Sequence, residues 1–158
     1  MSIASIIANL PALVVVIPLL LAPIAALIPI SGAAWLVAVI GSGGALVSAF
    51  LLQGAVSNGS SFSYHLGSWP PPWGIEFVVD SASALTVLIM AALAFVATLF
   101  ARKALPAEIN EKDIGKAYSA WLLACGGLAG LVMTGDAFNL FVVLEISALS
   151  SGILIARG

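Results

Sequence analysis

The chain has 158 residues, of which 62% are hydrophobic and only 8% are charged, and its formal net charge is -2. Soluble domains carry about 25% charged residues, so this sequence has too few polar side chains to cover a water-exposed surface. The acidic balance and the lack of a basic patch also argue against a nucleic-acid partner. The composition therefore predicts an all-α, polytopic integral membrane protein.

The first apolar block runs from about residue 3 to residue 56, which is too long for a single membrane crossing. About 20 apolar residues in a helix cross the roughly 30 Å hydrocarbon core of a bilayer. The segment IPISG at residues 28–32 provides a natural break in this block. We therefore expect a first helix at about 7–29 and a second helix at about 33–54.

The next segment, residues 55–79, is polar and rich in turn-forming residues, with Trp69 and Trp73 on either side of three prolines. Tryptophan favours the headgroup region of a bilayer, so we expect this loop to lie against a membrane surface. Two short extended pieces, Phe62–Leu66 and Ile75–Val79, are expected to pair across the proline turn. The segment therefore predicts a small β-hairpin outside the hydrocarbon core.

Three further helices are expected after this loop. Gly135 suits a helix end and Asp136 suits the N-cap of the following helix, so a boundary is placed between them. We expect helices at about 80–100, 116–134 and 137–156, with the strongly charged segment 101–115 as a loop between the first two. The whole chain, residues 1–158, is then a single membrane domain of five helices.

The basic residues decide the predicted orientation, because Lys and Arg are enriched in cytoplasmic loops. With five helices, every Lys and Arg of the chain falls on one side of the membrane: Arg102, Lys103, Lys112, Lys116 and Arg157. We therefore expect the 101–115 loop in the cytoplasm, with the N-terminus and the 55–79 loop outside. We expect the chain to be a multi-pass protein of a prokaryotic plasma membrane.

The fifth expected helix contains a carboxylate near its middle, Glu145. At about 1.5 Å per residue, Glu145 lies roughly 13 Å from Asp136 and 18 Å from Arg157, close to the bilayer midplane. An acidic residue at this depth costs about 2.5–3.5 kcal/mol on insertion scales, and acids inside membranes mark ion or proton pathways. We therefore expect a proton relay at Glu145. The alternative is a permanently protonated side chain that bonds to a neighbouring carbonyl or serine.

A cationic partner for Glu145 is not expected within this chain. No other charged residue is predicted at a comparable depth. The residues on its helical face offer no counter-charge: Phe138, Phe141, Ala148, Leu149 and Gly152. Any cationic partner of Glu145 must therefore come from outside the chain.

The other polar residues fit structural roles more simply. Asp136 and Asn139 suit helix-start chemistry, and Ser147 can bond to a carbonyl one turn back; a place in an ion pathway is the alternative for all three. His65 and the single cysteine, Cys125, lack the neighbouring ligands that a metal site needs. The sequence therefore predicts no catalytic residue, no metal and no cofactor.

Two segments carry a family resemblance: YHLGSWPPPWGIEFVVDSASALTVLIM at residues 64–90, and TGDAFNLFVVLEISALSSGILIA at residues 134–156. They resemble the third and fifth helices of the D-type subunit of the Mrp-type monovalent cation/proton antiporters. The broader group contains the proton-conducting antiporter-like subunits of complex I and of membrane-bound hydrogenases. The resemblance covers essentially the whole chain and corresponds to the N-terminal third of the family.

This resemblance implies a partner for Glu145. In the family, the glutamate at the matching position pairs with a lysine on a later, broken helix, in a line of charged residues along the membrane midplane. The lysine and the second inverted repeat lie beyond the segment matched by this chain, so another polypeptide would have to supply them. The implied partners are other antiporter subunits and the lipid bilayer, and the implied transported ions are protons with Na+ or K+.

Several alternatives stay open. The chain could be the first piece of a split subunit, a truncated product, or a reduced descendant with a structural role. One rival function is an antiporter-like, proton-translocating membrane subunit of an NADH–quinone oxidoreductase or hydrogenase, driven by electron transfer in other subunits. The other rival is a structural or assembly protein, in which Glu145 could be replaced without effect.

Overall fold

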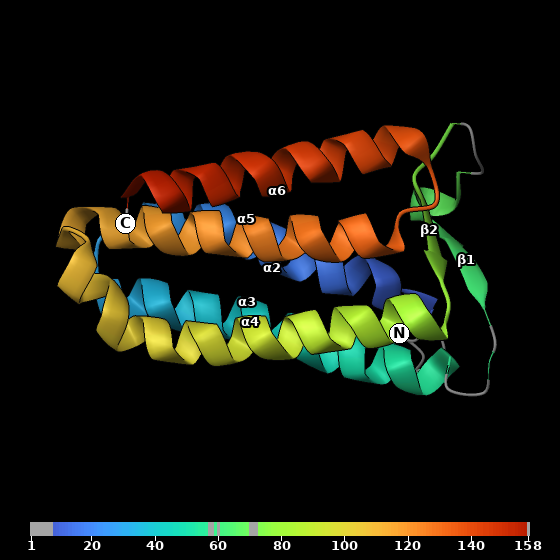
Figure 1. Ribbon diagram of the computed structural model, residues 1–158, viewed down its shortest axis with the longest axis horizontal. Coiled ribbons are helices and arrows are strands. Elements are labelled where there is room, and N and C mark those ends of the chain that lie inside the picture. Colours follow the sequence, from blue (N-terminus) through green and yellow to red (C-terminus); the bar gives the residue numbers. More distant parts are fainter. Residues whose placement is uncertain (1–7, 57–58, 60, 70–72, 158) are drawn as a thin grey trace.

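A computed structural model describes residues 8–56, 59, 61–69 and 73–157 of the chain. Within these ranges, five helices are long and apolar enough to cross a membrane. They run back and forth along one axis as a bundle, and a two-stranded hairpin covers one end (Figure 1). The all-α membrane fold expected from composition is confirmed.

The helices follow the expected order along the chain. They are α2 (Leu10–Leu27), α3 (Ser31–Val56), α4 (Ser81–Glu108), α5 (Ile114–Met133) and α6 (Ala137–Arg157). The break between α2 and α3 lies at the predicted IPISG segment. The first helix is expected from about residue 7, and residue 7 lies outside the described ranges.

Helix α4 is longer than the sequence predicts, because it ends at Glu108 and not at about residue 100. A 3-10 turn, η2 (Glu111–Asp113), then leads into α5. The first part of the expected 101–115 loop is thus helical. The charged residues end the stretch that suits the hydrocarbon core. Most residues of 101–108 are good helix formers, and α4 continues through them, although this segment also contains Pro106.

An aspartate comes directly before two of the helices. Asp80 precedes α4, which follows the hairpin, and Asp136 precedes α6, which follows the α5–α6 turn. The Asp80 carboxylate accepts a 2.7 Å hydrogen bond from the backbone N–H of Ser83, whose hydroxyl accepts one from the N–H of Asp80. Such a capping box satisfies two donors that the first turn of a helix leaves without partners. These hydrogen bonds hold the pKa of the Asp80 carboxyl below its usual range.

The predicted hairpin is confirmed. Strand β1 (Phe62–His65) pairs antiparallel with β2 (Glu76–Val79), with Phe62 opposite Val79 and His65 opposite Glu76. A 3-10 turn, η1 (Leu66–Ser68), follows β1. Alternate β2 side chains, Phe77 and Val79, are buried against the helices, so the hairpin closes this end of the bundle.

Helix α5 lies at the centre of the bundle and contacts each of the other four described helices. Its buried positions are mostly alanine and glycine, which allow helix backbones to approach closely in a membrane. By contrast, α4 presents large apolar side chains to the outside of the bundle: Leu85, Ile89, Leu93, Val96, Leu99 and Phe100. The outer face of α4 therefore suits contact with lipid.

A hydrogen-bond cluster that the sequence did not predict joins α3, α4 and α5 around the fully buried Thr98. The indole N–H of Trp35 donates to the Thr98 carbonyl, and that of Trp121 donates to the Thr98 hydroxyl oxygen, each at 2.9 Å. The Arg102 guanidinium lies over the Trp35 ring, 4.4 Å from its centroid. The cluster depends on three segments far apart in sequence, so no local pattern could reveal it.

We expect Thr98→Val to lower the stability of the bundle by about 1–2 kcal/mol, because the partly buried Trp121 N–H loses its acceptor. Thr86→Val is a matched control on the same helix. Both hydroxyls donate to the carbonyl four residues back, but the Thr86 side chain is exposed and no indole bonds to it among the described residues. Thermal unfolding in mild detergent should show a lower Tm for Thr98→Val only, and equal shifts would contradict the role assigned to this cluster.

The membrane orientation is predicted from the clustering of basic residues and can be tested separately from the fold. The hairpin and the α4–α5 connection lie at opposite ends of the bundle, and the C-terminal end lies beside the α4–α5 connection (Figure 1). Ser63→Cys and Asn110→Cys, each in a Cys125→Ser background, place single exposed thiols at the two ends. In intact cells, an impermeant maleimide should label residue 63 and leave residue 110 unlabelled, and the reverse would invert the topology.

Candidate functional site

Helix α6 packs on α5 along one face only. Its buried positions recur every three or four residues and are Asn139, Val143, Ser147 and Ser150. The approach is close at Gly127 of α5, where an added Cβ atom would lie 3.0 Å from the backbone nitrogen of Ser147. This tight contact fixes which side of α6 faces the bundle and which side faces away.

Glu145 lies on the side of α6 that faces away from the bundle. The residues that share its face are also exposed, among them Phe138 at 74%, Phe141 at 68% and Leu149 at 61%. The carboxylate forms no hydrogen bond or ion pair with any residue in the described part of the chain. Glu145 is therefore placed to meet a group that the described residues do not supply.

The position of Glu145 along α6 limits the partners that its carboxylate can have in a membrane. It lies eight residues after the first residue of the span Ala137–Ala156, about 12 Å along the helix axis. The described basic side chains are on the last turns of α4, on η2 and on the first turn of α5, at one end of the bundle. A carboxylate at this depth must be neutral, or face a cation or a polar cavity formed with another component.

Asp136 and Asn139 lie at the hairpin end of α6 and not beside Glu145. The Asp136 carboxylate accepts hydrogen bonds from the backbone N–H of Asn139 at 2.7 Å and of Glu76 at 3.0 Å. The amide of Asn139 donates to the Thr134 hydroxyl at 2.9 Å. These bonds cap α6 and attach the α5–α6 turn to β2, while a place for either residue in an ion pathway stays a prediction.

Ser147 is close to Glu145 in sequence but lies on the opposite face of α6. Its hydroxyl donates to the Leu144 carbonyl at 2.9 Å, and the side chain is buried against α5. The structure therefore does not bring Ser147 together with Glu145. Among the residues that the structure describes, no group of three or more His, Cys, Asp or Glu side chains is arranged to hold a metal ion.

Comparison with known proteins matches this chain to membrane subunits of two kinds. The N-type subunit of NADH-quinone oxidoreductase from Desulforudis audaxviator is 36% identical over 159 residues, which cover 96% of this chain and 30% of that protein. The D-type subunit of the Na(+)/H(+) antiporter from Alkalihalophilus pseudofirmus is 35% identical over 113 residues, which cover 72% of this chain and 22% of that protein. The chain is homologous to part of the antiporter-like membrane subunits.

Solved structures support the same relationship to the antiporter-like subunits. A chain of the Mrp complex from Dietzia sp. DQ12-45-1b superposes with a TM-score of 0.78 at 29% identity, covering 92% of this chain and 26% of that chain. A chain of the archaeal membrane-bound sulfane sulfur reductase also has a TM-score of 0.78, at 30% identity, covering 90% of this chain and 29% of that chain. The resemblance found in the sequence is confirmed.

The homology is limited in extent. The chain spans less than a third of the length of these two curated relatives. No family model matches the chain. The antiporter-like relationship therefore describes this segment, and the activity of a whole antiporter-like protein is carried to it only as a proposal.

Proposed function

We propose that the chain forms part of a multi-subunit monovalent cation/proton antiporter in a prokaryotic plasma membrane, with Glu145 as a proton relay. The observation that carries this proposal is the position of Glu145. It is a carboxylate in the middle of an apolar helix, turned away from its own bundle, in a homologue of antiporter-like subunits. Other subunits would supply the cationic partner, for which the ammonium of a lysine is the expected group.

A relay needs a group whose protonation can change during the cycle. Low-dielectric surroundings favour the neutral acid, whereas a nearby ammonium favours the carboxylate. A partner that moves toward and away from Glu145 would therefore make the side chain release and take up a proton. The outer face of α6 is suited to this, because no other described helix covers it.

A second function is favoured by a specific observation. The relative from the NADH-quinone oxidoreductase matches 96% of the chain, whereas the relative from the Na(+)/H(+) antiporter matches 72%. Under this alternative, the chain belongs to a redox-driven complex, and electron transfer in other subunits drives proton movement past Glu145. The proton relay is common to both functions, and only the driving reaction differs.

Everted vesicles that contain the complete assembly separate the two functions. For an antiporter, addition of Na+ or K+ should dissipate a preformed pH gradient without an electron donor. For a redox-driven subunit, the cations should have no effect, and an oxidisable donor should generate the gradient. A dependence on the donor alone would overturn the antiporter proposal, and genes for flavin and iron–sulfur subunits beside this one would argue in the same direction.

Vesicles that contain only this polypeptide provide the control for a structural or assembly role. We expect no measurable cation/proton exchange from the chain alone, because the partner of Glu145 is missing. Robust exchange by the isolated chain would show that it does not need the proposed partner. Unchanged transport in an assembly that lacks the chain would show that the chain takes no part in transport.

A further inference from the structure

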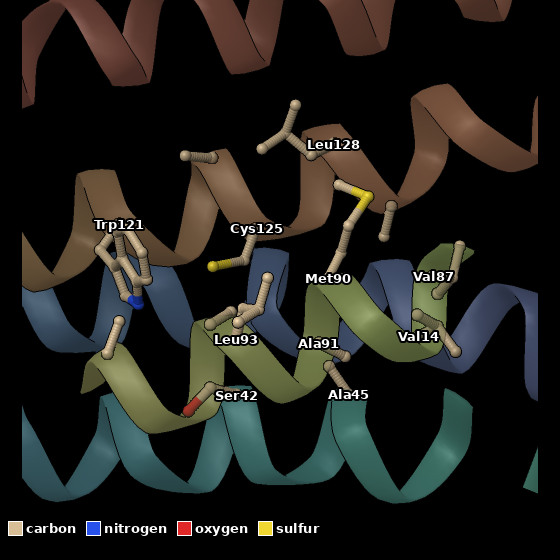
Figure 2. A pocket seen from close by; sticks show the side chains of 14 residues that line it. Val14, Ser42, Ala45, Val87, Met90, Ala91, Leu93, Trp121, Cys125 and Leu128 are labelled. Atoms are coloured by element: carbon tan, nitrogen blue, oxygen red, sulfur yellow. The ribbon is translucent and has the colours of Figure 1, made fainter. Parts of the chain in front are cut away.

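An apolar groove between α4 and α5 lies away from the outer face of α6 that carries Glu145. Its larger part has a volume of about 310 Å³ and extends down to Val14 of α2 and to Ser42 and Ala45 of α3 (Figure 2). A smaller part of about 110 Å³ lies toward the charged end of the bundle, where Leu154 of α6 also lines it. Both parts are lined by Ala97 and Trp121, so they adjoin each other along α4 and α5, and together they are called the groove.

The groove opens to the outside of the bundle. Leu93 of α4 and Leu128 of α5 both line it and are 67% and 39% exposed. Along α4 the lining extends from Val87 to Leu105, which is about 27 Å at 1.5 Å per residue. One leaflet of the hydrocarbon core is about 15 Å thick, and an apolar cavity of about 150 Å³ already holds benzene. The groove therefore has the length, volume and polarity for an acyl chain.

Positive charge lies at the end of this groove. Arg102 follows Ala101, which lines the groove, and Lys103 is the next residue. Neither cation forms an ion pair with a carboxylate in the described part of the chain, where the two ion pairs are His65–Glu76 and Lys116–Asp113. Basic residues beside a membrane attract anionic headgroups by about 1 kcal/mol each.

We infer that the groove between α4 and α5 binds one anionic phospholipid, with an acyl chain in the groove and the phosphate beside Arg102 and Lys103. An anionic phospholipid matches both features of the site. Its acyl chain is apolar, as the groove is, and its phosphate carries the negative charge that Arg102 and Lys103 attract. An apolar transmembrane helix would cover the groove but would supply no anionic partner for Arg102 or Lys103, of which Arg102 already lies over the Trp35 ring. This site lies on another side of the bundle from Glu145 and does not depend on the proposed transport function.

Native mass spectrometry of the purified chain in mild detergent tests the site with phosphatidylglycerol and phosphatidylcholine of the same acyl chains. We expect phosphatidylglycerol to bind more tightly. Arg102→Gln should weaken its binding about fivefold, as expected for the loss of one membrane-proximal charge. Arg102→Lys keeps the charge and should retain most of the preference, and Lys112→Gln, which removes an exposed cation outside the groove, should leave binding unchanged.

A second pair of variants tests the groove itself. Ala94→Leu places three more carbon atoms in the groove and should weaken both lipids roughly tenfold, equivalent to about 1.4 kcal/mol of lost packing. Ala82→Leu, at an exposed position of the same helix outside the groove, should have no effect. Inorganic phosphate should not displace the lipid, because it offers no acyl chain.

Four results would overturn this inference. The first is equal affinity of the wild-type chain for the two lipids. The second is undiminished phosphatidylglycerol binding by a folded Ala94→Leu variant. The third is displacement of the lipid by inorganic phosphate alone. The fourth is a lipid-free dimer that Ala94→Leu dissociates, which would assign the groove to a second copy of the chain.

Discussion

Replacement of Glu145 by glutamine should abolish proton translocation by the complete assembly while the assembly still forms. Glutamine keeps the shape and hydrogen-bonding capacity of the side chain but cannot release a proton. Glu145→Asp keeps the acid and withdraws it by one methylene, so part of the activity should remain. The measurement is the cation-driven pH change in everted vesicles, normalised to the amount of assembled complex.

The control for this experiment is a second glutamate in a different environment. Glu76 lies on β2 at the hairpin end, where its carboxylate is 3.5 Å from the His65 imidazole. Glu76→Gln removes the same charge and should leave transport largely intact. If a fully assembled Glu145→Gln variant transports at the wild-type rate, Glu145 has only the structural role of a hydrogen-bonded neutral side chain.

The second large effect is expected at Gly115, the second residue of α5, where the helix meets the end of α2. A Cβ atom at this position would lie 2.7 Å from the Ala25 carbonyl oxygen and 2.8 Å from that of Ile28. Both contacts are with backbone, which cannot rotate away as a side chain can. Overpacking costs about 1–3 kcal/mol and occasionally more, so we expect Gly115→Val to lower the free energy of unfolding by about 3 kcal/mol.

Gly32→Val is the matched control for this prediction. Gly32 is also the second residue of its helix, α3, but an added Cβ atom would meet nothing within 4 Å. Both substitutions introduce the same β-branched residue near a helix start, so the difference between them isolates the contact with α2. Unfolding by SDS, followed by circular dichroism, should show a loss of stability for Gly115→Val and little change for Gly32→Val.

Much of the fold followed from local signals in the sequence. Long apolar runs locate helices because a membrane-spanning backbone must satisfy its own hydrogen bonds, and a helix does this within one segment. The break at residues 28–32 and the aspartate that begins α6, Asp136, also act over a few residues only. The same is true of the hairpin between β1 and β2, whose strands are joined by a short turn-rich segment. Such features need no knowledge of the rest of the chain.

The end of α4 shows where local signals stop being sufficient. Charge at Arg102 and Lys103 marks the point where the chain leaves the hydrocarbon core, and hydropathy predicts the helix end at that point. Helix propensity does not depend on the membrane boundary, and α4 continues to Glu108 because most residues of 101–108 favour a helix, with Pro106 as the exception. The boundary of the membrane and the boundary of the helix are two different quantities, and hydropathy reports only the first.

The sequence by itself determined that the chain is an apolar helical membrane protein with an acid near the middle of its last predicted span. Only the tertiary structure decided which way that acid points. The close contact of α5 with α6 at Gly127 turns Ser147 inward and leaves Glu145 on the uncovered face. The Thr98 cluster and the groove between α4 and α5 were likewise decided by packing. They combine residues from three or more helices, and such contacts arise from the three-dimensional arrangement of helices, which no periodicity along one segment encodes.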